Sequence, residues 1–179
     1  MTLILSKKYN PLFDSKARYF IITGGRGSGK SFAVTVFLTL LTMSRNVRVL
    51  FTRYTMTSAH LSIIPEFLEK IGLLGYDNTF SVNKAEVINL GNKSDILFRG
   101  IKTSAGNQTA SLKSLQGIST WVLDEAEELV DENIFDTIDL SIREKDIHNR
   151  VVLILNPVTK EHWIYKRFFE DKGIEGGFN

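Results

Sequence analysis

The residues with the clearest chemistry form a glycine-rich run that ends in a lysine and a serine. Residues 24–31 read GGRGSGKS and fit the pattern G-x-x-x-x-G-K-[ST], which binds nucleotide phosphates when a strand precedes it and a helix follows. The glycines let backbone N–H groups turn toward a phosphate, and the helix dipole adds positive potential there. Lys30 is expected to reach the β- and γ-phosphates and Ser31 to bind Mg²⁺. A glycine-rich turn that binds nothing would not need a lysine and a hydroxyl at these positions.

Two carboxylates follow a short apolar run further along the chain. Residues 121–123 read WVL and are followed by Asp124 and Glu125. A phosphate-binding loop (P-loop) needs a carboxylate on a neighbouring strand to organise Mg²⁺, and Asp124 is placed for that task. Glu125 is then the candidate general base that polarises the attacking water. The alternative is a solvated helix start, where acidic residues are favoured by the helix dipole.

Two further polar residues are candidates for contact with the γ-phosphate. Arg26 stands inside the loop, where it either stabilises charge in the transition state or is an ordinary exposed arginine. Asn156 ends an apolar run and either senses the γ-phosphate, holds the water or is a turn residue before Pro157. Nucleotide contacts are predicted for the whole loop and the residue after it: Gly24, Gly25, Arg26, Gly27, Ser28, Gly29, Lys30, Ser31 and Phe32. The acidic residues between Glu127 and Asp139 are interpreted as a solvated face.

Composition limits the other chemistries. The chain has no cysteine, which excludes disulfides, thiolate catalysis and cysteine-ligated metals, and its three scattered histidines offer no ligand spacing. A net charge of +2 permits DNA binding without arguing for it. We identify no signal peptide, and no apolar run approaches the roughly 20 residues of a membrane span. A cytoplasmic location is therefore expected.

The pattern of apolar runs and glycines predicts an α/β fold. Buried strands are predicted at residues 18–23, 47–52, 120–123 and 151–155, and helices at 31–44, 57–71, 125–142 and 160–171. Residues 79–99 predict an antiparallel hairpin or meander, and the small polar residues 102–114 a mobile loop. Strands that alternate with helices imply a mainly parallel sheet covered on both faces, here with a small antiparallel edge.

Together these residues resemble the ATPase domain of the large terminase subunit, the DNA-packaging motor of tailed bacteriophages. The matching features lie between about Tyr9 and Pro157. They are the GGRGSGKS loop with its Arg26, Arg53 after the second strand, the FRG at 98–100, the KSLQG at 113–117, the WVLDEAEEL block and the LNP at 155–157. The resemblance implies a three-layer P-loop NTPase of the additional-strand, catalytic-glutamate type.

The resemblance also implies a function and partners. It implies Mg²⁺-dependent ATP hydrolysis that moves double-stranded DNA into a procapsid, by a homo-oligomeric ring at the portal that works with a small terminase subunit in the infected bacterial cell. Arg26 matches an arginine that acts within its own subunit, and either Lys113 or Arg143 is a candidate to act on a neighbour. A residue between Tyr9 and Arg18 would contact adenine, and Asn156 matches a segment that couples hydrolysis to movement.

Full-length members of that family also carry a nuclease domain. Too few residues follow Pro157 for such a domain, so residues 1–172 are expected to form the ATPase domain and 173–179 a linker, without nuclease activity. Two other functions stay open: another P-loop helicase or translocase, stimulated by single strands, and a nucleotide-binding switch without rapid turnover.

Overall fold

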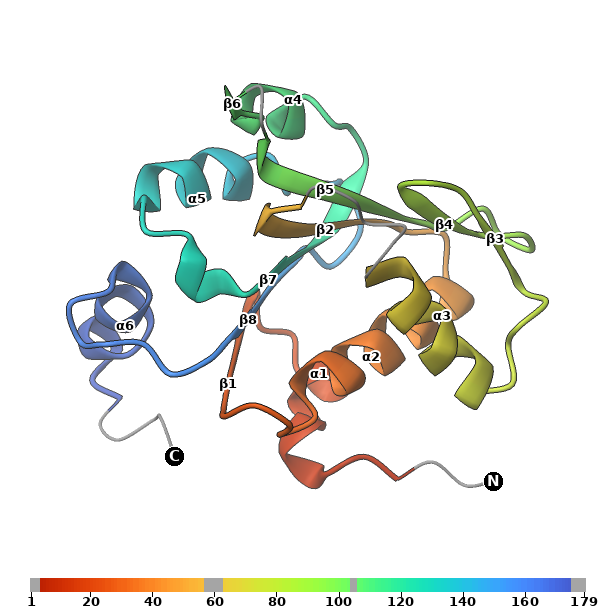
Figure 1. Ribbon diagram of the computed structural model, residues 1–179, viewed down its shortest axis with the longest axis horizontal. Coiled ribbons are helices and arrows are strands. Elements are labelled where there is room, and N and C mark those ends of the chain that lie inside the picture. The colour runs from red at the N-terminus through yellow and green to blue at the C-terminus, as the bar shows by residue number, and fades with distance from the viewer. Residues whose placement is uncertain (1–3, 57–62, 104–105, 175–179) are drawn as a thin grey trace.

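Helices cover both faces of one mixed sheet (Figure 1). The structure is a computed structural model and describes residues 4–56, 63–103 and 106–174. Strands in the described part are β1 (Tyr19–Thr23), β2 (Arg48–Thr55), β3 (Phe80–Val82), β4 (Glu86–Asn89), β5 (Asp95–Thr103), β6 (Gly106–Asn107), β7 (Ile118–Asp124) and β8 (Arg150–Leu155). The helices are α1 (Pro11–Asp14), α2 (Lys30–Ser44), α3 (Ile63–Leu73), α4 (Thr109–Lys113), α5 (Glu132–Asp139) and α6 (Trp163–Phe168), with 3-10 turns η1 (Lys7–Tyr9), η3 (Ala126–Glu128) and η4 (Glu170–Lys172).

The strand order confirms the predicted fold class. The sheet runs β1-β8-β7-β2-β5-β4-β3, and β6 pairs with β5. All neighbours from β1 to β5 are parallel, whereas β3, β4 and β6 pair antiparallel. Strand β8 lies between β1, which leads into the glycine-rich loop, and β7, which ends in Asp124. This inserted strand is the additional strand of the predicted type.

Alternation along the central strands builds two separate cores. On β7, Val122 belongs to a core that includes residues of α1, α2 and α3, whereas Trp121 and Leu123 belong to a core with α4, α5 and α6. Figure 1 shows these two sets of helices on opposite sides of the sheet. Because successive side chains of a strand point to opposite faces, an unbroken apolar run is what a strand covered on both sides requires.

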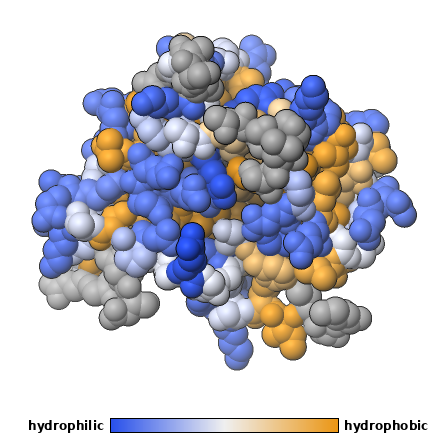
Figure 2. All heavy atoms as spheres, viewed as in Figure 1, coloured by the Kyte–Doolittle hydropathy of each residue, from blue (hydrophilic) through white to orange (hydrophobic). Residues whose placement is uncertain are grey.

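The antiparallel meander predicted over 79–99 is confirmed. Strands β3, β4 and β5 form it, and β5 also pairs in parallel with β2, which joins the meander to the central sheet. Residues 102–114, predicted to be a loop, contain the end of β5, strand β6 and helix α4, with Leu112 buried. In Figure 2 hydrophobic residues gather near the edge of the sheet formed by β3 and β4. Val82 in β3 and Leu90 just after β4 are exposed.

The prediction of a single acidic helix over 125–142 was also wrong. The chain forms the 3-10 turn η3, passes through an extended Leu129 and restarts as α5, where Asp131 accepts a hydrogen bond from the backbone N–H of Asn133. Leu129 is fully buried, so the break turns an apolar side chain into the core. The helix predicted over 160–171 is likewise divided into α6 and η4, and residues 57–62 of the helix predicted over 57–71 lie outside the described part. No helix of the described residues is long and apolar enough to cross a membrane.

Candidate nucleotide-binding and hydrolysis site

The glycine-rich loop connects the end of β1 to the first turn of α2. Gly29 has a φ of +83°, a conformation that favours glycine, and its carbonyl accepts from the N–H of Ala33 in the first turn of α2. A side chain at Gly24 would meet the Ser28 hydroxyl oxygen at 2.9 Å, so a larger residue there would have to displace this hydroxyl. The Ser28 hydroxyl is buried and has no partner among the described residues. An orphaned donor inside a loop of backbone N–H groups fits an oxygen-rich anion such as phosphate.

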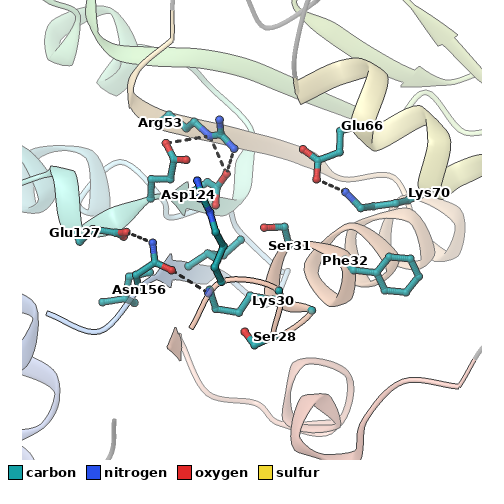
Figure 3. A pocket seen from close by; sticks show the side chains of 16 residues that line it. Ser28, Lys30, Ser31, Phe32, Arg53, Glu66, Lys70, Asp124, Glu127 and Asn156 are labelled. Carbon is teal, nitrogen blue, oxygen red and sulfur yellow. Dashed lines mark hydrogen bonds and ion pairs between the residues drawn. The ribbon is translucent and has the colours of Figure 1, made fainter. Parts of the chain in front are cut away.

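Lys30 bends back over its own loop. Its ammonium group donates to the carbonyl oxygens of Gly24 and Gly25 and, at 3.3 Å, to Oδ1 of Asn156. All three partners are neutral oxygens, whereas charged phosphate oxygens form stronger, charge-assisted bonds with an ammonium group. Figure 3 shows Lys30 and Asn156 on one side of the cavity and Ser31 beside them.

The cavity gathers the predicted residues at the carboxyl ends of the parallel strands. It has a volume of about 390 Å³. Of the predicted site residues, Arg26, Gly27, Ser28, Gly29, Lys30, Ser31, Phe32, Asp124, Glu125 and Asn156 line it. Gly24 and Gly25 do not line the cavity themselves, but their carbonyl oxygens accept hydrogen bonds from Lys30 Nζ. The residue types fit ATP and Mg²⁺, since a hydroxyl and a carboxylate are ligands that Mg²⁺ accepts beside phosphate oxygens.

Glu125 is held in an uncommon backbone conformation. Its φ of +53° and ψ of +45° lie in the left-handed region, which is rare for residues other than glycine. Its side chain is 44% exposed and reaches the cavity. Burial raises the pKa of the Glu125 carboxyl, nearby Arg53 opposes this rise, and Asp124 adds to it. A carboxylate with a raised pKa is a better proton acceptor, which suits a general base.

Arg53 joins the two carboxylates, and sequence reasoning gave it no role in the site. Its Nε and Nη2 donate to Asp124 Oδ2 at 2.8 and 2.6 Å, and Nε lies 3.6 Å from Glu125 Oε2. Arg53 on β2 is in register with Asp124 on β7, so the sheet itself places the pair. The signal in the sequence is an arginine near the end of one strand and an aspartate at the end of another, but only the register makes them neighbours.

The Arg53–Asp124 pair gives a testable consequence for metal binding. In Arg53→Ala, Asp124 becomes a buried carboxylate without a partner, and the free energy of unfolding should fall by about 3 kcal/mol. Mg²⁺ would then supply the missing positive charge, so added Mg²⁺ should raise the melting temperature of Arg53→Ala more than that of the wild type. Differential scanning calorimetry with and without Mg²⁺ measures this.

The matched control for this measurement is Arg48→Ala. Arg48 lies at the other end of β2 and pairs with Asp95 at 2.9 Å, far along the strand from the cavity. Mg²⁺ should leave its melting temperature unchanged relative to the wild type. An equal Mg²⁺ effect on both variants would contradict a metal site at Asp124.

Helix α3 and η3 also supply residues that the sequence did not predict for the site. Glu66 and Lys70 line the cavity and pair with each other at 2.6 Å, and the Lys70 side chain is only 11% exposed. Glu127, interpreted from the sequence as part of a solvated face, also lines the cavity, and its Oε1 accepts from Asn156 Nδ2 at 2.7 Å. The spacing of Glu66 and Lys70 identifies a helix pair, but nothing in the sequence assigns it to the cavity.

The remaining sequence candidates lie around the site or away from it. Tyr9, in the segment predicted to contact adenine, is buried and donates from its hydroxyl to the Ser28 carbonyl oxygen at 2.9 Å. Lys113 is exposed at the end of α4. Arg143 is exposed and follows Ile142, whose carbonyl accepts from Arg18 just before β1. Arg143 therefore lies near the amino end of β1, whereas the cavity lies at the carboxyl ends of the strands.

Solved structures similar to this chain share its fold. The large terminase from a thermophilic bacteriophage has a TM-score of 0.73 at 14% identity, with 95% of this chain and 43% of that chain covered. The same protein in complex with ATP-gamma-S gives 0.67 at 14%, covering 93% and 41%. The bacteriophage Phi-29 viral genome packaging motor assembly gives 0.64 at 17%, covering 93% and 51%. The chain therefore spans about half the length of these proteins or less.

A sequence comparison identifies the family. No curated protein matches the chain in sequence. A profile of the family described as phage terminase large subunit matches residues 16–176, which include the loop, both carboxylates and Asn156. The chain belongs to the phage terminase large subunit family.

Proposed function

We propose that this chain is the motor domain of a DNA-packaging terminase, which hydrolyses ATP with Mg²⁺ to move double-stranded DNA into a procapsid. One observation carries the proposal: the glycine-rich loop, Asp124 and Glu125 meet at a single cavity, with β8 inserted between their strands. The complex of the similar thermophilic bacteriophage terminase with ATP-gamma-S supports ATP as the nucleotide.

Each of the chain's residues has a role in this proposal. The loop and Lys30 bind the phosphates, Ser31 and Asp124 hold Mg²⁺, and Glu125 accepts a proton from the attacking water. Mg²⁺, when bound, neutralises charge that builds on the phosphate oxygens. Arg53 donates to Asp124 Oδ2, so Mg²⁺ would share the Asp124 carboxylate with a guanidinium. Arg26 is exposed on the loop and lines the cavity, where it can approach the transferring group.

The assembly is part of the same proposal. We assign residues 1–172 to an ATPase domain that works as a homo-oligomeric ring at the capsid portal in the infected bacterial cell, together with a small terminase subunit. The likeness to the Phi-29 packaging motor assembly supports a multi-subunit motor. A basic residue from a neighbouring subunit, for which Lys113 and Arg143 are the candidates, would complete the transition-state charge.

Stimulation by nucleic acid tests the coupling to DNA. Steady-state phosphate release with ATP and Mg²⁺ should rise severalfold when blunt duplex DNA is added, and it should fall as salt is raised because phosphate contacts dominate such binding. Single-stranded DNA of the same sequence and length is the matched control and should stimulate less. Stronger stimulation by single strands would instead support a helicase-like motor.

A further inference from the structure

The exposed amide of Asn156 lies between two charged groups. Lys30 Nζ donates to its Oδ1 at 3.3 Å, and its Nδ2 donates to Glu127 Oε1 at 2.7 Å (Figure 3). An ammonium group can only donate and a carboxylate can only accept. In the opposite amide orientation the donor Nδ2 would face the donor Lys30 Nζ, and the acceptor Oδ1 would face the acceptor Glu127 Oε1. The polarity of the Asn156 amide is therefore set by its partners.

Glu127 depends on this one contact. Its Oε2 is buried and has no hydrogen-bond partner among the described residues, while Oε1 is bound by Asn156. A buried carboxylate oxygen without a donor is costly, so the carboxylate is sensitive to the loss of its remaining donor. Glu127 therefore responds to whatever changes the orientation of Asn156.

From these contacts we propose that Glu127 is the positioning residue for Asn156 and the first group to respond when the γ-phosphate site fills. The proposal rests on the proposed function, in which Lys30 binds phosphate. When Lys30 exchanges Asn156 Oδ1 for a phosphate oxygen, Oδ1 faces a second acceptor. Asn156 relieves this contact by rotating its amide so that Nδ2 donates into the cavity. Glu127 then loses its donor, and its carboxylate must move.

The structure also contains a route from Glu127 to the last helix. The backbone carbonyl of Glu127 is 3.2 Å from His162 Nε2, and His162 Nδ1 accepts from the N–H of Ile164 in the first turn of α6. Since Nδ1 accepts, Nε2 carries the proton and donates to Glu127. The next residue, Trp163, donates from its indole N–H to the Leu129 carbonyl at 2.6 Å. A shift of the segment from Glu127 to Leu129 would therefore act on His162, the N-cap of α6, and on Trp163, its first residue.

Glu127→Gln tests this inference because the side chain keeps its shape. A glutamine amide can accept from Asn156 or donate to it, so it removes the preference for one orientation. In the wild type, binding of ATP-gamma-S costs a charge-assisted hydrogen bond. ADP offers Lys30 only the β-phosphate, and because an ammonium group has three donors, Lys30 can bind that phosphate and keep Asn156 Oδ1. Calorimetric titration should therefore show that the ratio of the dissociation constants, ATP-gamma-S over ADP, falls about tenfold in Glu127→Gln.

Trp163 fluorescence gives a second readout that does not depend on turnover. In the wild type, ATP-gamma-S but not ADP should change the emission of Trp163, and Trp163→Phe identifies the part of the signal that comes from this residue rather than Trp121. The change should be lost in Glu127→Gln. Glu128→Gln removes the same charge one residue further on, from an exposed side chain, and should keep both the emission change and the wild-type ratio.

The outcomes separate the inference from the proposed function. One outcome is that the wild type binds both nucleotides while the ratio of dissociation constants changes equally in Glu127→Gln and Glu128→Gln. That result would show a long-range charge effect, and it would overturn the inference while the proposed function stands. An unchanged Trp163 response in Glu127→Gln would also overturn it. Failure of the wild type to bind either nucleotide would refute the proposed function and this inference together.

Discussion

Glu125→Ala is expected to lower ATP turnover by a factor on the order of 10² to 10⁴ while nucleotide binding persists. The phosphate contacts in this account come from the loop and Lys30, so removing the base leaves them in place. Glu125 reaches the cavity with a raised pKa and stands beside Asp124, where water bound near the metal would be within its reach. Single-turnover conversion of labelled ATP, with binding measured on the same preparation, separates the two effects.

The control for Glu125 is Glu128→Ala. Glu128 is an exposed acidic residue three positions later in the chain and does not line the cavity, so its loss should leave turnover unchanged. Glu125→Gln adds a second comparison, because it keeps the side-chain shape without the basic oxygen. Normal turnover in Glu125→Gln would show that Glu125 is not the base.

Lys30→Ala is expected to weaken nucleotide binding by about tenfold to a hundredfold. Lys30 provides charge-assisted hydrogen bonds to phosphate, each of which contributes more than a neutral bond, and about 1.4 kcal/mol corresponds to a factor of ten. The variant should lose more affinity for ATP-gamma-S than for adenosine, which has no phosphate. Calorimetric titration with both ligands checks this difference.

A second lysine of the same cavity is the control for Lys30. Lys70 also lines the cavity, but its charge is balanced by Glu66 at 2.6 Å. Lys70→Ala should therefore reduce affinity much less than Lys30→Ala. An equal loss in both variants would mean that the cavity responds to total positive charge rather than to a lysine in the loop.

The loop and the strand order could be predicted because each depends on short, local patterns. The run at 24–31 requires a strand before it and a helix after it, and the structure has β1 and α2 in those places. The residues WVL before Asp124 fit a strand that is buried on both faces, which β7 is. Parallel strands end at a common edge, and this property brings the loop, the carboxylates and Asn156 to one cavity.

The rest of the site depends on contacts between distant parts of the chain. Arg53 and Asp124 meet only through the register of β2 and β7. Glu127 has the same residue type as its exposed neighbour Glu128, so the sequence does not set it apart. The left-handed conformation of Glu125 starts the 3-10 turn η3, and this turn places Glu127 against Asn156. A helical pattern over 125–142 hides this break because charged residues are compatible with both structures.

β5 shows the same limit for the sheet. Its apolar residues 96–98 follow the predicted turn, and it does pair antiparallel with β4 on one side. Its other side pairs in parallel with β2, far earlier in the chain. The antiparallel meander could therefore be predicted from residues 79–99, whereas the parallel pairing of β5 with β2 is decided only by the three-dimensional arrangement.

Phosphate release by the wild type, measured in steady state with ATP, Mg²⁺ and duplex DNA over a series of protein concentrations, tests the central claim most directly. We expect release that requires Mg²⁺, and a rate per subunit that rises with concentration, because a basic residue from a neighbour can contribute a factor of about 10³ to 10⁵. Tight nucleotide binding with no phosphate release at any concentration would contradict the account and identify a nucleotide-binding switch instead.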